Sequence, residues 1–207
     1  VFLHGLCENE SYWQRHRDRT GTTYAEELAG RGWTPLMLRA NTGLPLRENG
    51  AALTGLMQQV VEAWPVPVER IALVGHSMGG LVIRAAGAVA ADVEEPWSSK
   101  VSDVVTLGTP HLGAPIAWGI GHGSRGLGVL PETAAFGRLL DWRSAGVHDL
   151  VAGLAEDVAP LPHARYRLVA ATLTGSQRHP VGHLVGDLLV RPRSAYGRDR
   201  RGRSPFP

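Results

Sequence analysis

The residues most able to do chemistry are five in a row, Gly75 to Gly79, which read Gly-His-Ser-Met-Gly. They follow the apolar run 71–74 and open into a stretch of small and apolar residues, 80–87. This pattern predicts a strand, a tight turn and a helix, with Ser77 at the turn. A serine hydroxyl is a poor nucleophile in water, and such a turn lifts its oxygen clear of a sheet toward a base. Ser77 is therefore the candidate nucleophile.

A second candidate segment stands at the start of the sequence, where Val1-Phe2-Leu3 runs into His4-Gly5-Leu6-Cys7. In serine hydrolases a His-Gly loop after a strand supplies one backbone N–H of the oxyanion hole, and the residue after the nucleophile supplies the other. The expected donors are the amides of Leu6 and Met78, with Cys7 as second choice for the first. Each such donor stabilises a transition state by roughly 3–4 kcal/mol.

Two later segments complete a resemblance to a known family. Gly108-Thr109-Pro110-His111-Leu112-Gly113 follows the apolar run 104–107, and Val185-Gly186-Asp187-Leu188-Leu189-Val190 lies near the end. Together with the serine turn and the His-Gly loop, they resemble segments of the α/β-hydrolase superfamily. Within it, the sequence is similar to triacylglycerol-lipase-like and GPI-inositol-deacylase-like esterases, from residue 1 to about residue 197.

The resemblance implies hydrolysis of a carboxylic ester, of a small molecule or a lipid, through a Ser-Asp-His triad and an acyl-enzyme intermediate. The family order is serine, then acid, then histidine, which makes Asp187 the expected acid partner of Ser77. Asp157 and Asp149 are the alternative acids. No cofactor and no metal are implied. An acyltransferase or amidase using the same triad, and a non-catalytic binding protein of the same fold, are the alternative functions.

The histidines depart from the family pattern, because all nine precede Asp187. We therefore expect the base histidine beyond residue 207 and interpret the sequence as part of the fold, truncated at both ends. Without a base this part should be nearly inactive. His183 and His111 are the alternative bases within the sequence. His4, His76 and His111 are the histidines expected at the pocket.

Apolar strand patterns alternate with helical patterns along the sequence, which predicts an α/β fold. The α/β-hydrolase fold has a mostly parallel central sheet with helices on both faces, and we expect it as a single domain over 1–207. Strands are expected at 1–4, 34–39, 70–75, 101–107 and 166–173, and helices at about 21–31, 48–63 and 79–91. Residues 111–165 break the alternation and are expected to form a lid or cap insertion, with a plain loop as the alternative.

Composition narrows the function classes further. The sequence has 207 residues, is 43% hydrophobic and carries a formal net charge of +2, which suits one globular domain. Six arginines lie between 191 and 203, and we interpret them as a solvated loop, so no nucleic-acid partner is expected. No apolar run reaches the roughly 18–20 residues that span a bilayer. Because Cys7 is the single cysteine, an internal disulfide is excluded. The cysteine count does not assign a compartment, and we slightly favour the cytoplasm. The oligomeric state stays open.

Two other patterns in the sequence resemble a nucleotide-binding motif and a metal site, but their surroundings do not fit. Gly121, Gly123 and Gly126 match the dinucleotide-binding spacing G-x-G-x-x-G, but neither a strand before them nor a helix after them is predicted. His179 and His183 have the spacing of metal ligands on a helix, but a proline and a glycine between them argue against that helix. Neither a nucleotide nor a metal site is expected.

Overall fold

The protein is described here by a computed structural model, which covers residues 1–89, 93–113, 158–171, 190, 192–198 and 202–206. Within these residues five strands form one parallel sheet in the order β2-β1-β3-β4-β5. The strands are β1 (Phe2–Leu3), β2 (Met37–Leu38), β3 (Ile71–His76), β4 (Val101–Leu107) and β5 (Arg165–Val169). The longest helices are α3 (Leu46–Ala63) and α4 (Met78–Gly87). The shorter ones are η1 (Glu10–Gln14), α1 (Arg17–Thr20), α2 (Tyr24–Ala29), η2 (Trp97–Lys100) and α10 (Pro192–Ala195).

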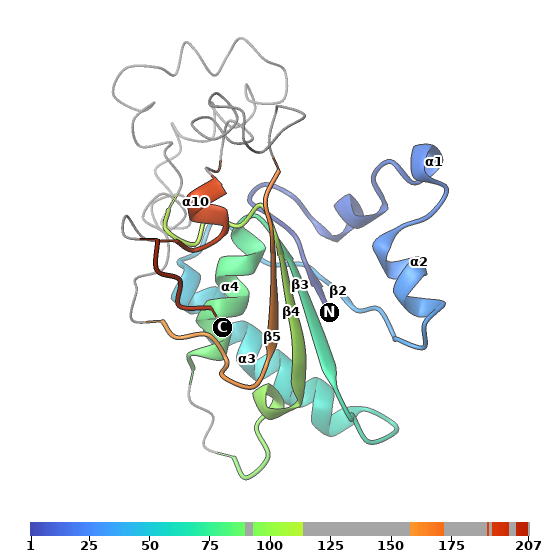
Figure 1. Ribbon diagram of the computed structural model, residues 1–207. Coiled ribbons are helices and arrows are strands. Elements are labelled where there is room, and N and C mark those ends of the chain that lie inside the picture. Colours follow the sequence, from blue (N-terminus) through green and yellow to red (C-terminus); the bar gives the residue numbers. More distant parts are fainter. Residues whose placement is uncertain (90–92, 114–157, 172–189, 191, 199–201, 207) are drawn as a thin grey trace.

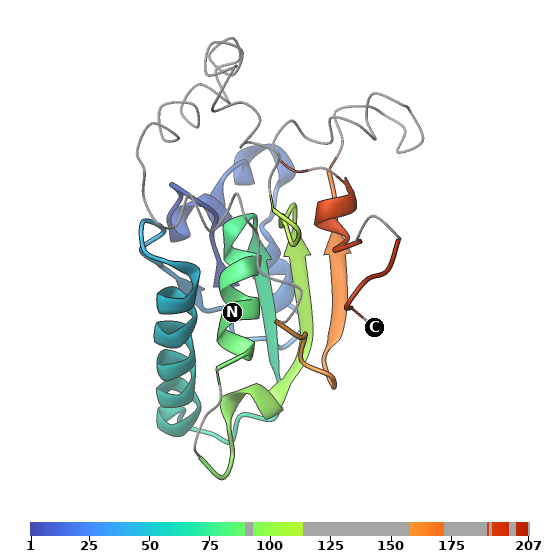
Figure 2. The ribbon, with the colours of Figure 1, turned by 90° about the vertical axis from the view of Figure 1, so that its left-hand side faces the viewer.

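The sheet separates two layers of helices (Figure 1). Helices α3 and α4 lie side by side against one face (Figure 2), and Thr54 of α3 ties them together by donating to the Ala86 carbonyl at 2.9 Å. The main apolar core fills the space between these helices and the strands. It includes Leu3, Leu46, Leu53, Met57, Leu73, Met78, Leu81, Val101 and Val104. Burial of these side chains is the main force that holds both helices on the sheet.

A smaller apolar cluster covers the opposite face of the sheet. There the ring of Trp13 meets the edge of Phe2 with 5.0 Å between ring centroids, and Ala25 packs close to Val74. Helix α2 begins with a capping box, in which Thr23 and Glu26 exchange side-chain and backbone hydrogen bonds. This cluster attaches η1 and α2 to the sheet, and it confirms that helices lie on both faces.

The expected strands and helices are present, with shorter ends in several places. The strand expected at 34–39 pairs only at Met37–Leu38, because β2 is an edge strand and its partner β1 is itself only two residues long. Strand β5 ends at Val169, the partner of the last residue of β4, rather than at 173. Helix α4 ends at Gly87 rather than 91. Most of the expected lid insertion, 114–157, lies outside the described residues.

The first turn of α4 sits directly on the backbone of β1. A Cβ at Gly79 would clash with the carbonyl oxygen of Leu3 and would lie 2.6 Å from that of His4. Main-chain atoms held in a sheet cannot move aside as a flexible side chain can. Only glycine therefore allows this helix to approach the strand so closely.

We expect Gly79→Ala to destabilise the fold by about 1–3 kcal/mol, because the added methyl group overpacks the contact between α4 and β1. Gly55→Ala is the matched control. Gly55 also lies in a helix, α3, and a Cβ there would meet no atom within 4 Å. That substitution should stabilise the protein by about 0.5–1 kcal/mol. Urea unfolding of both variants measures the difference, and similar midpoints for the two would contradict the close approach.

Candidate active site

The candidate site lies where the parallel strands end. His76 of β3 pairs in register with Leu107 of β4, and the Ser77 amide donates to the Leu107 carbonyl at 2.8 Å. Ser77 has φ 49° and ψ −121°, a backbone conformation rare for a residue with a side chain. It is the residue between β3 and α4, as the sequence pattern predicts. The strained turn is the geometry that exposes a side-chain oxygen above a sheet.

The loop His4–Glu8 follows β1 and covers the serine turn; we call it the N-terminal loop. A Cβ at Gly5 would lie 3.1 Å from the Cβ of Ser77 and 3.0 Å from Nδ1 of His76. Any side chain at position 5 would press on both residues. Glycine at this position lets the main chain of the loop lie directly against the serine.

His4 orients the peptide that carries the Leu6 amide. Its ring is buried, Nε2 accepts from the Ala40 amide at 3.0 Å, and Nδ1 therefore carries the hydrogen and donates to the Gly5 carbonyl at 2.9 Å. In a trans peptide the C=O and the following N–H point in opposite directions. Because the Gly5 carbonyl is held by the imidazole of His4, the Leu6 N–H points away from that ring.

The two expected oxyanion donors differ from their alternative in their hydrogen bonds. Within the described residues, neither the Leu6 amide nor the Met78 amide donates a hydrogen bond. The Cys7 amide donates to the Thr42 hydroxyl at 3.3 Å. Met78 is also the first residue of α4, whose unpaired N–H groups and dipole favour negative charge at that end. Because the Leu6 amide donates to no other described group, it is a better candidate than the Cys7 amide for the first oxyanion donor.

Glu8 joins the N-terminal loop to the serine turn. Its Oε2 accepts from the Gly5 amide at 2.7 Å and from Nδ1 of His76 at 2.9 Å. Burial opposes ionisation of Glu8, but the hydrogen bond and charge of His76 and the Gly5 amide outweigh it and lower the pKa of this carboxyl below its ordinary value. Glu8 therefore acts as a charged acceptor at neutral pH. Sequence reasoning assigned it no role.

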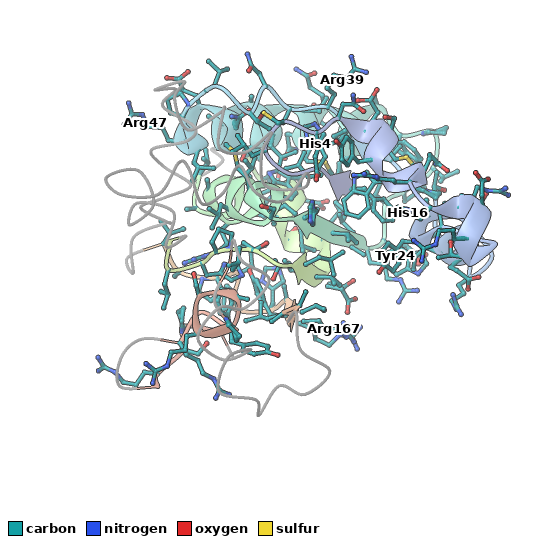
Figure 3. The ribbon with its side chains drawn as sticks, turned by 90° about the horizontal axis from the view of Figure 1, so that it is seen from above. His4, His16, Tyr24, Arg39, Arg47 and Arg167 are labelled. Atoms are coloured by element: carbon teal, nitrogen blue, oxygen red, sulfur yellow. The ribbon has the colours of Figure 1, made fainter. Side chains whose placement is uncertain are left out.

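A cavity of about 530 Å³ opens beside these residues, between the ends of β3 and β4 and the segment η1–α2. Glu8, His76 and Leu107 line it near the strand ends. The segment η1–α2 contributes the rings of Tyr12, Trp13 and Tyr24 and the polar side chains of Arg15, His16 and Glu27. Figure 3 shows His16 and Tyr24 on the N-terminal segment, to one side of the buried His4. The cavity therefore adjoins the serine turn through His76, and its aromatic rings can pack against an uncharged organic group.

His4 and His111 do not line this cavity, unlike His76. His111 is fully buried, its Nε2 lies 3.2 Å from the Thr106 hydroxyl, and its ring stands 4.7 Å from that of Phe206. Burial and the nearby positive charge of Arg84 lower the pKa of His111 to about 3. The imidazole is therefore neutral at ordinary pH.

Helix α10 fixes the segment that carries His111. The hydroxyl of Ser194 donates to the Gly113 carbonyl at 2.6 Å and accepts from the Leu112 amide at 3.1 Å, while the Ser194 carbonyl accepts from the His111 amide. No motif in the sequence points to this serine, because it lies in a Pro-Arg-Ser-Ala stretch of an arginine-rich segment. Ser194 holds in place the loop that follows β4.

The other expected site residues lie outside the described residues. They are Asp187, the alternative acids Asp149 and Asp157, and the alternative base His183. Among the described residues, His, Cys, Asp and Glu side chains form no group of three that could hold a metal ion. In the same part of the chain, no helix is long and apolar enough to cross a membrane.

Known proteins match this chain in family pattern and in fold. The family model described as a PGAP1-like alpha/beta domain matches residues 38–123. No curated protein matches the sequence. Among solved structures, the mature form of the Bacillus licheniformis lipase BlEst2 superposes with a TM-score of 0.66 at 21% identity, over 94% of this chain and 77% of that chain.

The propeptide form of the same lipase superposes with a TM-score of 0.63 at 20% identity, and there the match covers 42% of that chain. The parallel sheet, the helices on both faces and these superpositions agree on one architecture. The chain has the α/β-hydrolase fold, and it is similar to a PGAP1-like alpha/beta domain over residues 38–123 and to the two forms of the lipase over most of its length.

Proposed function

We propose that this protein is a serine hydrolase that cleaves carboxylic esters, with Ser77 as the nucleophile. The observation that carries the proposal is the backbone of Ser77, strained at φ 49° and ψ −121° between a central strand and the buried helix α4. Such strain persists only where the surrounding structure enforces it, and it gathers at functional sites. The lipase-like fold and the matching family pattern support the same conclusion.

The chemistry follows from the arrangement of the groups. The Ser77 oxygen attacks the ester carbonyl while its proton passes to a histidine base, and the carbonyl oxygen becomes an oxyanion. The amides of Leu6 and Met78 donate to that oxyanion. The histidine then protonates the departing alcohol, and water hydrolyses the acyl-enzyme by the same steps in reverse. We propose Asp187 as the acid that orients the histidine, and the base itself outside the 207 residues.

The cavity between β3, β4 and the segment η1–α2 is the proposed place for one side of the ester. Its size of about 530 Å³ falls within the range of small-molecule sites, and aromatic rings form part of its wall. The proposed substrate is an ester whose alkyl or aryl part packs on these rings, beside the polar side chains of Arg15, His16 and Glu27. The lid expected at 111–165 remains our proposal for 114–157 alone, because His111 and Ala164 are buried and Arg165 begins β5.

Ser77→Ala should lower hydrolysis of a short-chain p-nitrophenyl ester by about 10⁴-fold or more, because the acyl-enzyme cannot form. The measurement uses the natural gene product, and a fluorophosphonate probe should label the parent protein but not the variant. Ser99→Ala is the control, since Ser99 is an exposed serine in η2 at the opposite end of the sheet. A non-catalytic binding protein would show neither turnover nor labelling in any variant.

The 207-residue chain is assayed in parallel to locate the base. If the natural gene product is active and the 207-residue chain turns over slowly or not at all, the result supports a base histidine outside the 207 residues. Turnover as fast as that of the natural product would overturn this part of the proposal and place the base at His183 or His111.

His111→Gln should retain hydrolysis, because a histidine whose pKa is near 3 is too weak a base at neutral pH. The same substitution should change acid stability. Between pH 6.5 and about 3 the unfolded chain binds a proton at His111 that the folded chain excludes, so the free energy of unfolding falls with falling pH, by up to about 1.4 kcal/mol per unit. The variant should lose less stability on acidification.

Chemical denaturation between pH 7 and pH 4 measures this slope. His163→Gln, at an exposed histidine, is the control. Equal slopes for the parent protein and His111→Gln would contradict the burial of a neutral imidazole, and loss of hydrolysis by folded His111→Gln would restore His111 as a candidate base.

A further inference from the structure

The N-terminal loop and the serine turn are far apart in the sequence, yet one carboxylate oxygen links them. We propose that Glu8 is a positioning residue for ester hydrolysis, which holds the Leu6 amide in place relative to Ser77. The inference rests on the proposed function, since it assigns Leu6 and Ser77 their roles there. It adds a residue that touches neither the substrate nor the reacting atoms.

The contacts place Glu8 between the two segments that carry the oxyanion donors. On one side, Oε2 accepts from the amide of Gly5, whose carbonyl forms the peptide that ends in the Leu6 N–H. On the other side, the same oxygen accepts from the ring of His76, two residues before Met78. A single acceptor atom therefore fixes the loop against the turn at both points.

The other hydrogen bonds of the N-terminal loop run to a different segment. His4 bonds to the Ala40 amide, and the Cys7 amide bonds to Thr42, so both attach the loop to the segment between β2 and α3. Among the described residues, hydrogen bonds from the loop to the serine turn run through Glu8 alone. Without it, the pairing of β1 with β3 and the packing of Gly5 on Ser77 and of Gly79 on His4 would remain, but no described hydrogen bond would join the loop to the turn.

The strength of this link comes from charge and burial. The Glu8 side chain is 16% exposed, which limits the access of water to its carboxylate, whereas the ring of His76 is 43% exposed. Hydrogen bonds to an ionised acceptor are shorter and roughly twice as strong as those between neutral groups. Because an oxyanion donor works only when it is aimed at the developing charge, a small displacement of the loop lowers the rate rather than substrate binding.

The first test compares Glu8→Ala and Glu8→Gln in the natural gene product, with a p-nitrophenyl ester as substrate. Alanine removes both hydrogen bonds and should lower kcat about ten- to a hundredfold, with KM changed less than about twofold. The amide oxygen of glutamine can still accept both donors, although without charge, so Glu8→Gln should recover most of the lost kcat.

Glu10→Gln is the matched control. Glu10 lies two residues further along the chain and pairs with Arg39 on the surface, away from the serine turn. Its removal should leave kcat unchanged. An unchanged kcat in Glu8→Ala would overturn the proposal. So would a loss of activity that merely follows the loss of folded protein, or a rise in KM with no fall in kcat.

A second measurement does not depend on catalysis. The Gly5 amide should exchange its hydrogen with solvent faster in Glu8→Ala than in the parent protein or in Glu10→Gln, as followed by NMR. Unchanged exchange would overturn the link even if kcat fell. If Ser77→Ala left hydrolysis intact, the proposed function would fail, whereas the exchange rates would still decide whether Glu8 holds the loop.

Discussion

The structure depends on one close contact, that of the first turn of α4 with the main chain at the end of β1. Gly79 lies against the carbonyls of Leu3 and His4. The helix can begin immediately after β3 only because Ser77 takes up a strained turn, which costs about 1–3 kcal/mol. The packing of α4 sustains that strain, since nine of its ten residues are buried. The strained backbone of Ser77 is therefore a consequence of how the helix packs on the sheet.

The pairing of β1 with β3 sets the position of the loop after β1. Because β1 pairs with β3 directly, the loop that leaves it emerges beside the serine turn, at the shared carboxyl edge of the sheet. Backbone groups then form the core of the site, and side chains adjust them. His4 turns one peptide and Glu8 fixes the loop to the turn, and both are bound on two sides.

The elements and the serine were predictable because their signals are local. A continuous apolar run marks β3, and the glycines around Ser77 mark the turn, so a reader of the sequence needs no knowledge of distant residues. Glu8 was not predictable, because its partner His76 lies 68 positions away and a single glutamate in a polar loop has no pattern. The burial of His111 was hidden for a similar reason. Its cover is Phe206, which lies near the other end of the chain.

The two faces of the sheet carry different constraints. Helix α4 cannot change without disturbing the serine, whereas the segment η1–α2 touches the sheet through few side chains, chiefly Trp13 and Ala25. Helix α1 has no buried residue. This segment forms the outer wall of the cavity, so its residues can change the shape of the cavity while the turn, the loop and the sheet stay as they are. In the proposed function, the serine turn would therefore carry the reactivity, and substitutions in the segment η1–α2 would change which ester fits the cavity.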